Sequence, residues 1–200
     1  GHFFLDDPIA AYLPEFKDMK VYTEDGLVDA ESPITIRQLL THTSGIDYGF
    51  YADDSVAEMF RAASLNDGEA RAYSITTEEY VKKIATMPLY AQPGTTWRYS
   101  DAMAVLGRLL EVVSGQLYSI FLKKRLFNLL DMNDTDFYVP ADKLDRLAAL
   151  YETDSDGHFV ATDEVPPADY GVRVMQISDF SNRPSYESGG AGLVSTAIDY

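Results

Sequence analysis

The stretch Ile34-Thr35-Ile36-Arg37-Gln38-Leu39-Leu40-Thr41-His42-Thr43-Ser44-Gly45 contains the clearest structural signals in the chain. Thr35 followed three residues later by Gln38 is a capping box, in which each side chain satisfies a backbone N–H at a helix start. Gly45 lies just beyond the expected helix end. Between these signals runs an apolar stripe at helical spacing, made of Ile36, Leu39 and Leu40. A short capped helix that packs on a core is therefore predicted.

Similar signals predict most of the remaining elements. A second capping box, Thr76 with Glu79, opens a helix that Pro88 prevents from continuing. The strongest periodicity follows Ser100 and ends at Gly115. The other expected elements are a short helix from Asp7-Pro8 to Pro14, helices over 53–63 and 117–127, a turn-rich stretch over 22–29, and a hairpin around Asp156-Gly157.

These elements predict a mainly α fold with small β elements, of the α+β class. We expect residues 1–140 to be mostly helical and residues 141–200 to form a hairpin and loop region, with a glycine-rich approach at 188–192. Both ends read as cut within structure, because the chain opens without methionine and closes at Asp199-Tyr200 inside an apparent helix start. The expectation is a single internal fragment of a larger domain.

Composition narrows the classes of partner. The 200 residues are 46% hydrophobic and 24% charged, which is typical of a globular chain. Lys and Arg number 16 against 32 Asp and Glu, a formal charge of -16 that disfavours nucleic acid and anionic membranes. The chain has no cysteine, so disulfides and thiolate metal sites are excluded. No cofactor is expected.

Self-sufficient active-site motifs are missing from the sequence. It has no Gly-x-Ser-x-Gly nucleophile elbow, no His-Glu-x-x-His zinc motif and no glycine-rich nucleotide loop. His2, His42 and His158 have no helical metal-ligand spacing, so no metal site is expected. Pattern and spacing alone leave a mostly helical domain without an assigned chemistry.

Four stretches in a fixed order change this interpretation. They are Gly1–Phe16, Ile34–Gly45, Pro93–Asp101 and Gly190–Ala197. Together they resemble the serine β-lactamase and penicillin-binding-protein superfamily, most closely its class C β-lactamase-like branch, which includes carboxylesterases and D-aminopeptidases. The resemblance covers essentially the whole chain. It implies the helical domain, with the edges of the α/β domain, of a β-lactamase/transpeptidase-like fold.

The resemblance also implies a mechanism. A serine attacks an ester or amide carbonyl and forms an acyl-enzyme, while a lysine three residues later and a motif tyrosine move the protons. No serine here is followed by lysine at the third position, and Lys-Thr-Gly and His-x-Gly are both missing. We therefore expect a parent serine hydrolase with a small ester or amide substrate. The isolated fragment is expected to be inactive and to self-associate through exposed apolar surface.

Within the motif stretches, the resemblance singles out two catalytic residues. Tyr99 matches the tyrosine of the Tyr-x-Asn motif and implies a proton shuttle. Asp101 stands where the family usually has Asn, and an ionised carboxylate only accepts hydrogen bonds. This change favours an esterase over a β-lactamase. Asp101 is equally suited to be a helix N-cap.

The other motif residues receive supporting interpretations. By resemblance, Gly190 and Ala191 line the substrate site opposite Tyr99, or else form a hinge or tight turn. Trp97 is expected to pack beneath the motif, and His42 to cap local backbone rather than act as a base. Substrate choice depends on loop shape, which the sequence does not specify.

A non-catalytic relative that binds a ligand or partner is the alternative. Two departures from the family pattern support it. One is Asp101, and the other is Leu129–Met132, which replaces the family's Pro-Leu-Gly-Met. A parent that lacks Ser-x-x-Lys would favour this binding module.

Overall fold

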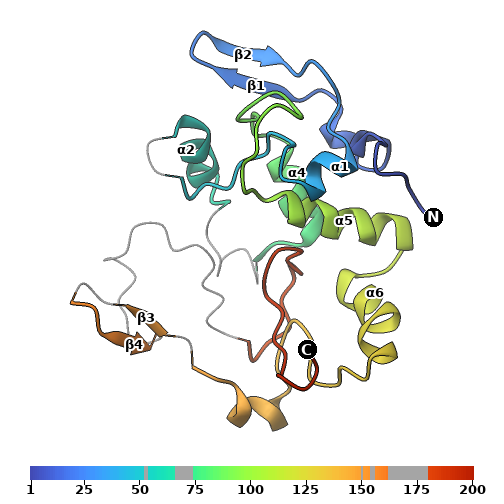
Figure 1. Cartoon of the computed structure of the whole chain (residues 1–200), viewed down its shortest axis with the longest axis vertical. Coiled ribbons are helices and arrows are strands. Elements are labelled where there is room, and N and C mark those ends of the chain that lie inside the picture. Colours follow the sequence, from blue (N-terminus) through green and yellow to red (C-terminus); the bar gives the residue numbers. More distant parts are fainter. Residues whose placement is uncertain (52–53, 66–73, 150, 154–155, 162–179) are drawn as a thin grey trace.

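The computed structural model describes residues 1–51, 54–65, 74–149, 151–153, 156–161 and 180–200. Its described part is mostly helical, with small β elements, as the sequence predicts (Figure 1). The helices are α1 (Ile36–Leu40), α2 (Ser55–Ala62), α4 (Thr77–Ile84), α5 (Ala102–Ser114) and α6 (Tyr118–Arg125). Four 3-10 turns accompany them, η1 (Ile9–Ala11), η2 (Pro14–Phe16), η3 (Phe127–Leu129) and η4 (Ala141–Arg146).

The two small sheets in the described part of the chain are antiparallel hairpins. β1 (Lys20–Thr23) pairs with β2 (Gly26–Asp29), and β3 (Tyr151–Thr153) pairs with β4 (Phe159–Ala161). The second hairpin confirms the Asp156-Gly157 signal, whereas only the turn of the first was predicted. β1 also bonds to Leu89, whose N–H donates to Lys20 O at 2.7 Å and whose carbonyl accepts from Tyr22 N at 2.9 Å. This long-range pairing explains why Tyr22–Asp29 forms strands rather than a turn-rich stretch.

Two helix starts follow the predicted capping chemistry. Thr35 and Gln38 form a complete capping box at α1, and Thr76 and Glu79 form another at α4. At α2, the Asp54 side chain accepts hydrogen bonds from the N–H groups of Val56 and Ala57. The end of α5 is at Gly115, whose φ of 66° is the left-handed conformation that favours glycine.

The core lies around α5. Figure 1 shows this helix in the middle of the molecule, with α1 and α4 against it and α6 beyond its C-terminal end. Its inward residues join the side chains of the N-terminal turns, α1, α2 and α4 in one apolar cluster. The most completely buried large side chains of this cluster include Ile9, Phe16, Ile36, Leu39, Phe60, Tyr80, Ile84 and Leu109.

The glycine-rich segment after Ser188 lies directly on α5. A Cβ at Gly189 would sit 2.0 Å from the Met103 carbonyl oxygen, and a Cβ at Gly107 would be 3.5 Å from Gly189 Cα. Only glycine at 189 permits this approach. The expected flexible approach at 188–192 is therefore a packed segment where it meets the helix.

Buried polar bonds hold the same segment. Glu187 is 4% exposed, and its carboxylate accepts from the backbone N–H of Ser119 at 2.6 Å and from the Ser119 hydroxyl. The Tyr186 ring packs on Tyr80 with 4.6 Å between centroids. These contacts connect the C-terminal part of the chain to α6 and α4.

Among the described residues, no single helix is long and apolar enough to cross a membrane. α5 and α6 together, extended to Leu129, meet the length and composition criteria only across a 75° bend.

Gly189→Ala is expected to destabilise the fold. The new methyl group would overlap the Met103 carbonyl, and such overpacking typically costs about 1–3 kcal/mol. Gly107→Ala is the matched control, because its methyl group meets only ordinary contacts and alanine favours the helix. Urea unfolding should show a lower midpoint for Gly189→Ala alone. Equal midpoints for both variants would contradict the packed arrangement.

Asp134 predicts an acid-sensitive contribution to stability. Hydrogen bonds from Arg146 and Lys143 lower the pKa of this carboxyl from 3.8 to about 2. Between these values the unfolded chain binds more protons, so the stabilisation is complete above about pH 4 and is lost as the pH falls through about 2. In Asp134→Asn, the urea midpoint of unfolding should vary less with pH between about pH 2 and pH 4 than it does in the wild type. Asp142→Asn, an exposed change on η4, should leave that slope unchanged.

Candidate active site

Tyr99 lies in the loop that leads into α5, and this loop is bonded to the segment after α1. The backbone N–H of Arg98 donates to His42 O at 2.8 Å, and that of Asp101 donates to Asp47 O at 3.1 Å. The Tyr51 hydroxyl donates to the Tyr99 carbonyl at 3.0 Å. The backbone on both sides of Tyr99 is thus fixed by one neighbouring segment, 42–51.

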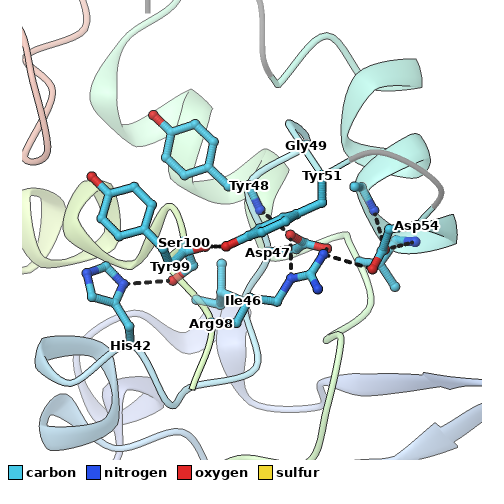
Figure 2. A network of polar contacts seen from close by, with 12 residues as sticks. His42, Ile46, Asp47, Tyr48, Gly49, Tyr51, Asp54, Arg98, Tyr99 and Ser100 are labelled. Carbon is cyan, nitrogen blue, oxygen red and sulfur yellow. Dashed lines mark hydrogen bonds and ion pairs between the residues drawn. The ribbon is translucent and has the colours of Figure 1, made fainter. Parts of the chain in front are cut away.

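A buried ion-pair cluster reinforces this junction (Figure 2). The Arg98 guanidinium donates two hydrogen bonds of 3.0 Å to the Asp47 carboxylate and a third of 2.8 Å to Asp54. Asp47 has no exposed side-chain surface, and the Arg98 side chain is 11% exposed. Since Asp54 also caps α2, the cluster joins three segments of the chain.

Aromatic rings cover the same guanidinium. Its central carbon lies 3.7 Å from the ring centroid of Tyr51 and 3.7 Å from that of Tyr90. Burial opposes the charge, but the hydrogen bonds and charge of Asp47 outweigh it and leave the pKa of Arg98 above its ordinary value. Burial raises the pKa of Asp47, although the hydrogen bonds from Arg98 act in the opposite direction.

The Tyr99 side chain points away from this cluster. It is 36% exposed, and its ring stacks beside that of Tyr48 with 5.9 Å between centroids and 15° between planes. Figure 2 shows the two rings side by side, with both hydroxyls directed away from the Arg98 ion pairs. The residue is therefore fixed at its backbone while its ring reaches the surface. Its predicted catalytic role remains a prediction.

His42 packs beside the Tyr99 ring and is bonded to Ser100. The His42 imidazole centroid lies 4.8 Å from that of Tyr99, and its Nδ1 lies 3.2 Å from the Ser100 hydroxyl oxygen. Ser100 Oγ also accepts from the Ala102 N–H at 3.4 Å. His42 therefore bonds to a side chain rather than capping local backbone as expected. Burial lowers the pKa of His42.

Asp101, two residues after Tyr99, points into the core. It is 4% exposed, and its carboxylate accepts from the Tyr80 hydroxyl at 2.6 Å. It occupies the N-cap position of α5, as the sequence predicts, but makes no side-chain capping bond there. This placement ties α4 to the start of α5. The catalytic assignment of Asp101 remains a prediction.

The remaining predicted residues lie in the loop before α5 and in the glycine-rich segment that packs on α5. Gly190 adjoins the first turn of α5, where a Cβ would lie 3.3 Å from Met103 Cβ, and Ala191 follows it in the chain. Their predicted substrate contact is not tested by this placement. Trp97 is 65% exposed and meets His42 edge-on, so it does not pack beneath the motif as expected.

Sequence reasoning missed the Arg98 cluster. Arg98 and Asp47 are far apart in the chain, and an ion pair between loops has no spacing signal. Arg98 lies within one motif stretch and Asp47 lies just after another, and this proximity is the sequence signal that could have indicated the ion pair. Among the described ranges, no group of three or more His, Asp or Glu side chains could hold a metal ion.

The fold and this tyrosine-bearing loop define a protein of the Beta-lactamase family, whose family model matches residues 1–200. The chain belongs to that family. Its mostly helical architecture matches part of the β-lactamase/transpeptidase-like fold, as the resemblance implies.

Curated relatives agree with this assignment. The chain is 32% identical to Esterase EstB of Burkholderia gladioli and 31% identical to Lovastatin esterase of Penicillium rubens, with 100% of this chain aligned. It is also 32% identical to Protein Rv1367c of Mycobacterium tuberculosis. The matches cover 49%, 47% and 46% of those proteins, so the chain spans about half their length.

Solved structures give the same fold. EstCE1, a hydrolase with promiscuous acyltransferase activity, superposes with a TM-score of 0.78 at 30% identity, covering 99% of this chain and 50% of that one. Simvastatin synthase LovD from Aspergillus terreus gives 0.72 at 24% identity, covering 100% of this chain and 46% of that one. The second match shows the fold alone.

Arg98→Ala is expected to lose about 3–5 kcal/mol of stability. The change leaves the buried Asp47 carboxylate without its partner, and the penalty for an uncompensated buried charge is of this size. Arg37→Ala is the matched control, because its ion pair with Asp6 is exposed and solvent-exposed pairs contribute little to stability. Denaturant unfolding measures both. A similar small loss in the two variants would contradict the structural role of the cluster.

Proposed function

We propose that the full-length gene product is a serine hydrolase that cleaves esters through an acyl-enzyme, and that Tyr99 transfers protons in this reaction. The observation that carries the proposal is the fixed backbone and exposed ring of Tyr99, within a chain whose relatives include esterases. A phenol held in this way can exchange a proton with a bound reactant without the loop having to reorganise.

Each half of the proposed reaction has two proton transfers. During acylation, Tyr99, as the tyrosinate, takes the proton of the serine hydroxyl as the serine oxygen attacks the ester carbonyl. It then gives that proton to the departing alcohol oxygen as the carbon–oxygen bond breaks. During deacylation, water replaces the alcohol and the same transfers run in reverse, which releases the carboxylic acid and restores the serine.

Arg98 is unsuited to stabilise a tyrosinate at position 99. Its three hydrogen bonds are directed to Asp47 and Asp54. The rings of Tyr51 and Tyr90 pack on its guanidinium group. A cation beside the phenol must therefore come from another group, and the Ser-x-x-Lys lysine of the family fits this need. The 200 residues contain no Ser-x-x-Lys and no Lys-Thr-Gly. We propose that these residues alone do not turn over esters.

Ester substrates fit better than β-lactam amides. A substrate amide finds no side-chain N–H donor at position 101, because a carboxylate stands there and is bonded to Tyr80. The binding-module alternative loses part of its support. Asp131, in the altered Leu129–Met132 turn, adopts a φ of 55°, so the aspartate takes the left-handed conformation expected of the family's glycine.

Tyr99→Phe in the full-length protein is expected to lower kcat for p-nitrophenyl butyrate by roughly 10²–10⁴-fold. This is the usual contribution of a positioned general acid–base group. Tyr151→Phe is the matched control, because Tyr151 is 63% exposed on β3. Nitrocefin hydrolysis measured in parallel separates ester from β-lactam preference.

Two results would overturn the proposal. One is a wild-type protein that neither hydrolyses p-nitrophenyl esters nor reacts covalently with a serine-directed phosphonate, which would favour the binding module. The other is a Tyr99→Phe variant with unchanged kcat. Ester turnover by the isolated 200 residues would contradict only the proposal that they are inactive alone.

A further inference from the structure

We propose that His42, acting through Ser100, is a positioning residue for Tyr99 and performs this role only as the neutral imidazole. The inference rests on the proposed function, since Tyr99 is the group that is positioned. It concerns a histidine for which the sequence predicts only local backbone capping.

The hydrogen bonds of Ser100 favour one tautomer of His42. The Ser100 side chain lies in a residue that is 2% exposed, and its oxygen contacts two groups, the Ala102 N–H and His42 Nδ1. An amide can only donate, so Ser100 Oγ accepts from Ala102. The buried hydroxyl proton has an acceptor in this contact when it is directed to Nδ1. In that arrangement His42 carries its own proton on Nε2 and is neutral.

The imidazole is held on its other sides as well. Its backbone adopts a φ of 54°, a left-handed conformation that costs a non-glycine residue free energy, and its carbonyl accepts from Arg98 N at 2.8 Å. The ring then lies 4.8 Å from the Tyr99 ring and meets Trp97 edge-on at 6.2 Å. His42 thus forms one wall against which the Tyr99 ring rests.

Protonation of His42 would break this arrangement. A proton on Nδ1 would turn the acceptor into a donor, and the Ser100 hydroxyl proton would then lack its acceptor in a buried position. Of the groups that face the imidazole, Trp97 and Ser100 are uncharged, and the Tyr99 phenol is uncharged until it loses its proton in the proposed reaction, so no permanent negative charge offsets the imidazolium. The charged side chains nearby in Figure 2 are paired with one another.

The direction of the pH effect follows from the environment. Burial lowers the pKa of His42 from its ordinary value of 6.5, so the neutral form persists at neutral pH and somewhat below. As the pH falls through this lowered pKa, the Ser100 bond is lost and Tyr99 loses its fixed wall. Activity is therefore expected to decline on the acid side.

The kinetic test compares kcat/KM against pH for wild-type full-length protein, His42→Asn and His2→Asn. Asparagine tolerates the left-handed backbone, presents an acceptor oxygen near the Nδ1 position and does not protonate. Wild type and His2→Asn should lose activity about tenfold per pH unit below a midpoint under 6.5. In His42→Asn this midpoint should fall by at least about one pH unit. An acid limb with the same midpoint in all three overturns the proposal.

A second measurement does not depend on turnover. NMR titration of the His42 imidazole should give a midpoint under 6.5, and the Ala102 amide should exchange faster with the same midpoint. Ser100→Ala removes the donor to Nδ1 and should raise the His42 midpoint. An unchanged midpoint in Ser100→Ala, or Ala102 exchange that ignores the His42 titration, overturns the positioning role. Failure of ester hydrolysis alone would overturn the proposed function. The NMR titration would then still test whether His42 and Ser100 are coupled as proposed.

Discussion

The arrangement around Tyr99 depends on one buried cation. Arg98 places its charge among two carboxylates and two aromatic faces, and the carboxylates belong to different segments. Removing these charges from water is costly, and the cost is offset only when every bond is formed at once. The cluster therefore favours a single mutual placement of the segment after α1, the start of α2 and the loop before α5. Specificity of geometry, rather than net stability, is its main contribution.

This constraint explains how a surface tyrosine can be precisely held. The bonds that fix Tyr99 act on its backbone and on its neighbours, through Tyr51, Arg98 and Ser100. The ring itself is bounded by Tyr48 and His42 but keeps one open side. The contacts that hold Tyr99 in place and the exposed side of its ring thus involve different groups, which suits the proton transfer that we propose for it.

The sequence predicted the features that depend on neighbouring residues in the chain, such as helix caps and helix ends. The capping boxes at α1 and α4 and the left-handed end of α5 depend on residues within one helical turn, so they were visible in the sequence. The β1–β2 strands were missed because Leu89 completes their edge from far along the chain. The Arg98 cluster, the exposure of Trp97 and the bond from Tyr80 to Asp101 were invisible for the same reason. Motif resemblance located Tyr99, whereas the contacts that hold it required the fold.

The start of α5 is held from two independent directions. The Arg98 cluster fixes the loop before it, and the segment around Glu187 fixes the helix from the opposite end of the chain through Gly189 and Gly107. The two meet at Tyr80, whose hydroxyl binds Asp101 and whose ring packs on Tyr186. A carboxylate at position 101 is a suitable acceptor for that hydroxyl. An aspartate rather than an asparagine at position 101 is therefore consistent with a structural role, in which the buried carboxylate bonds to Tyr80 while the Tyr99 ring is exposed.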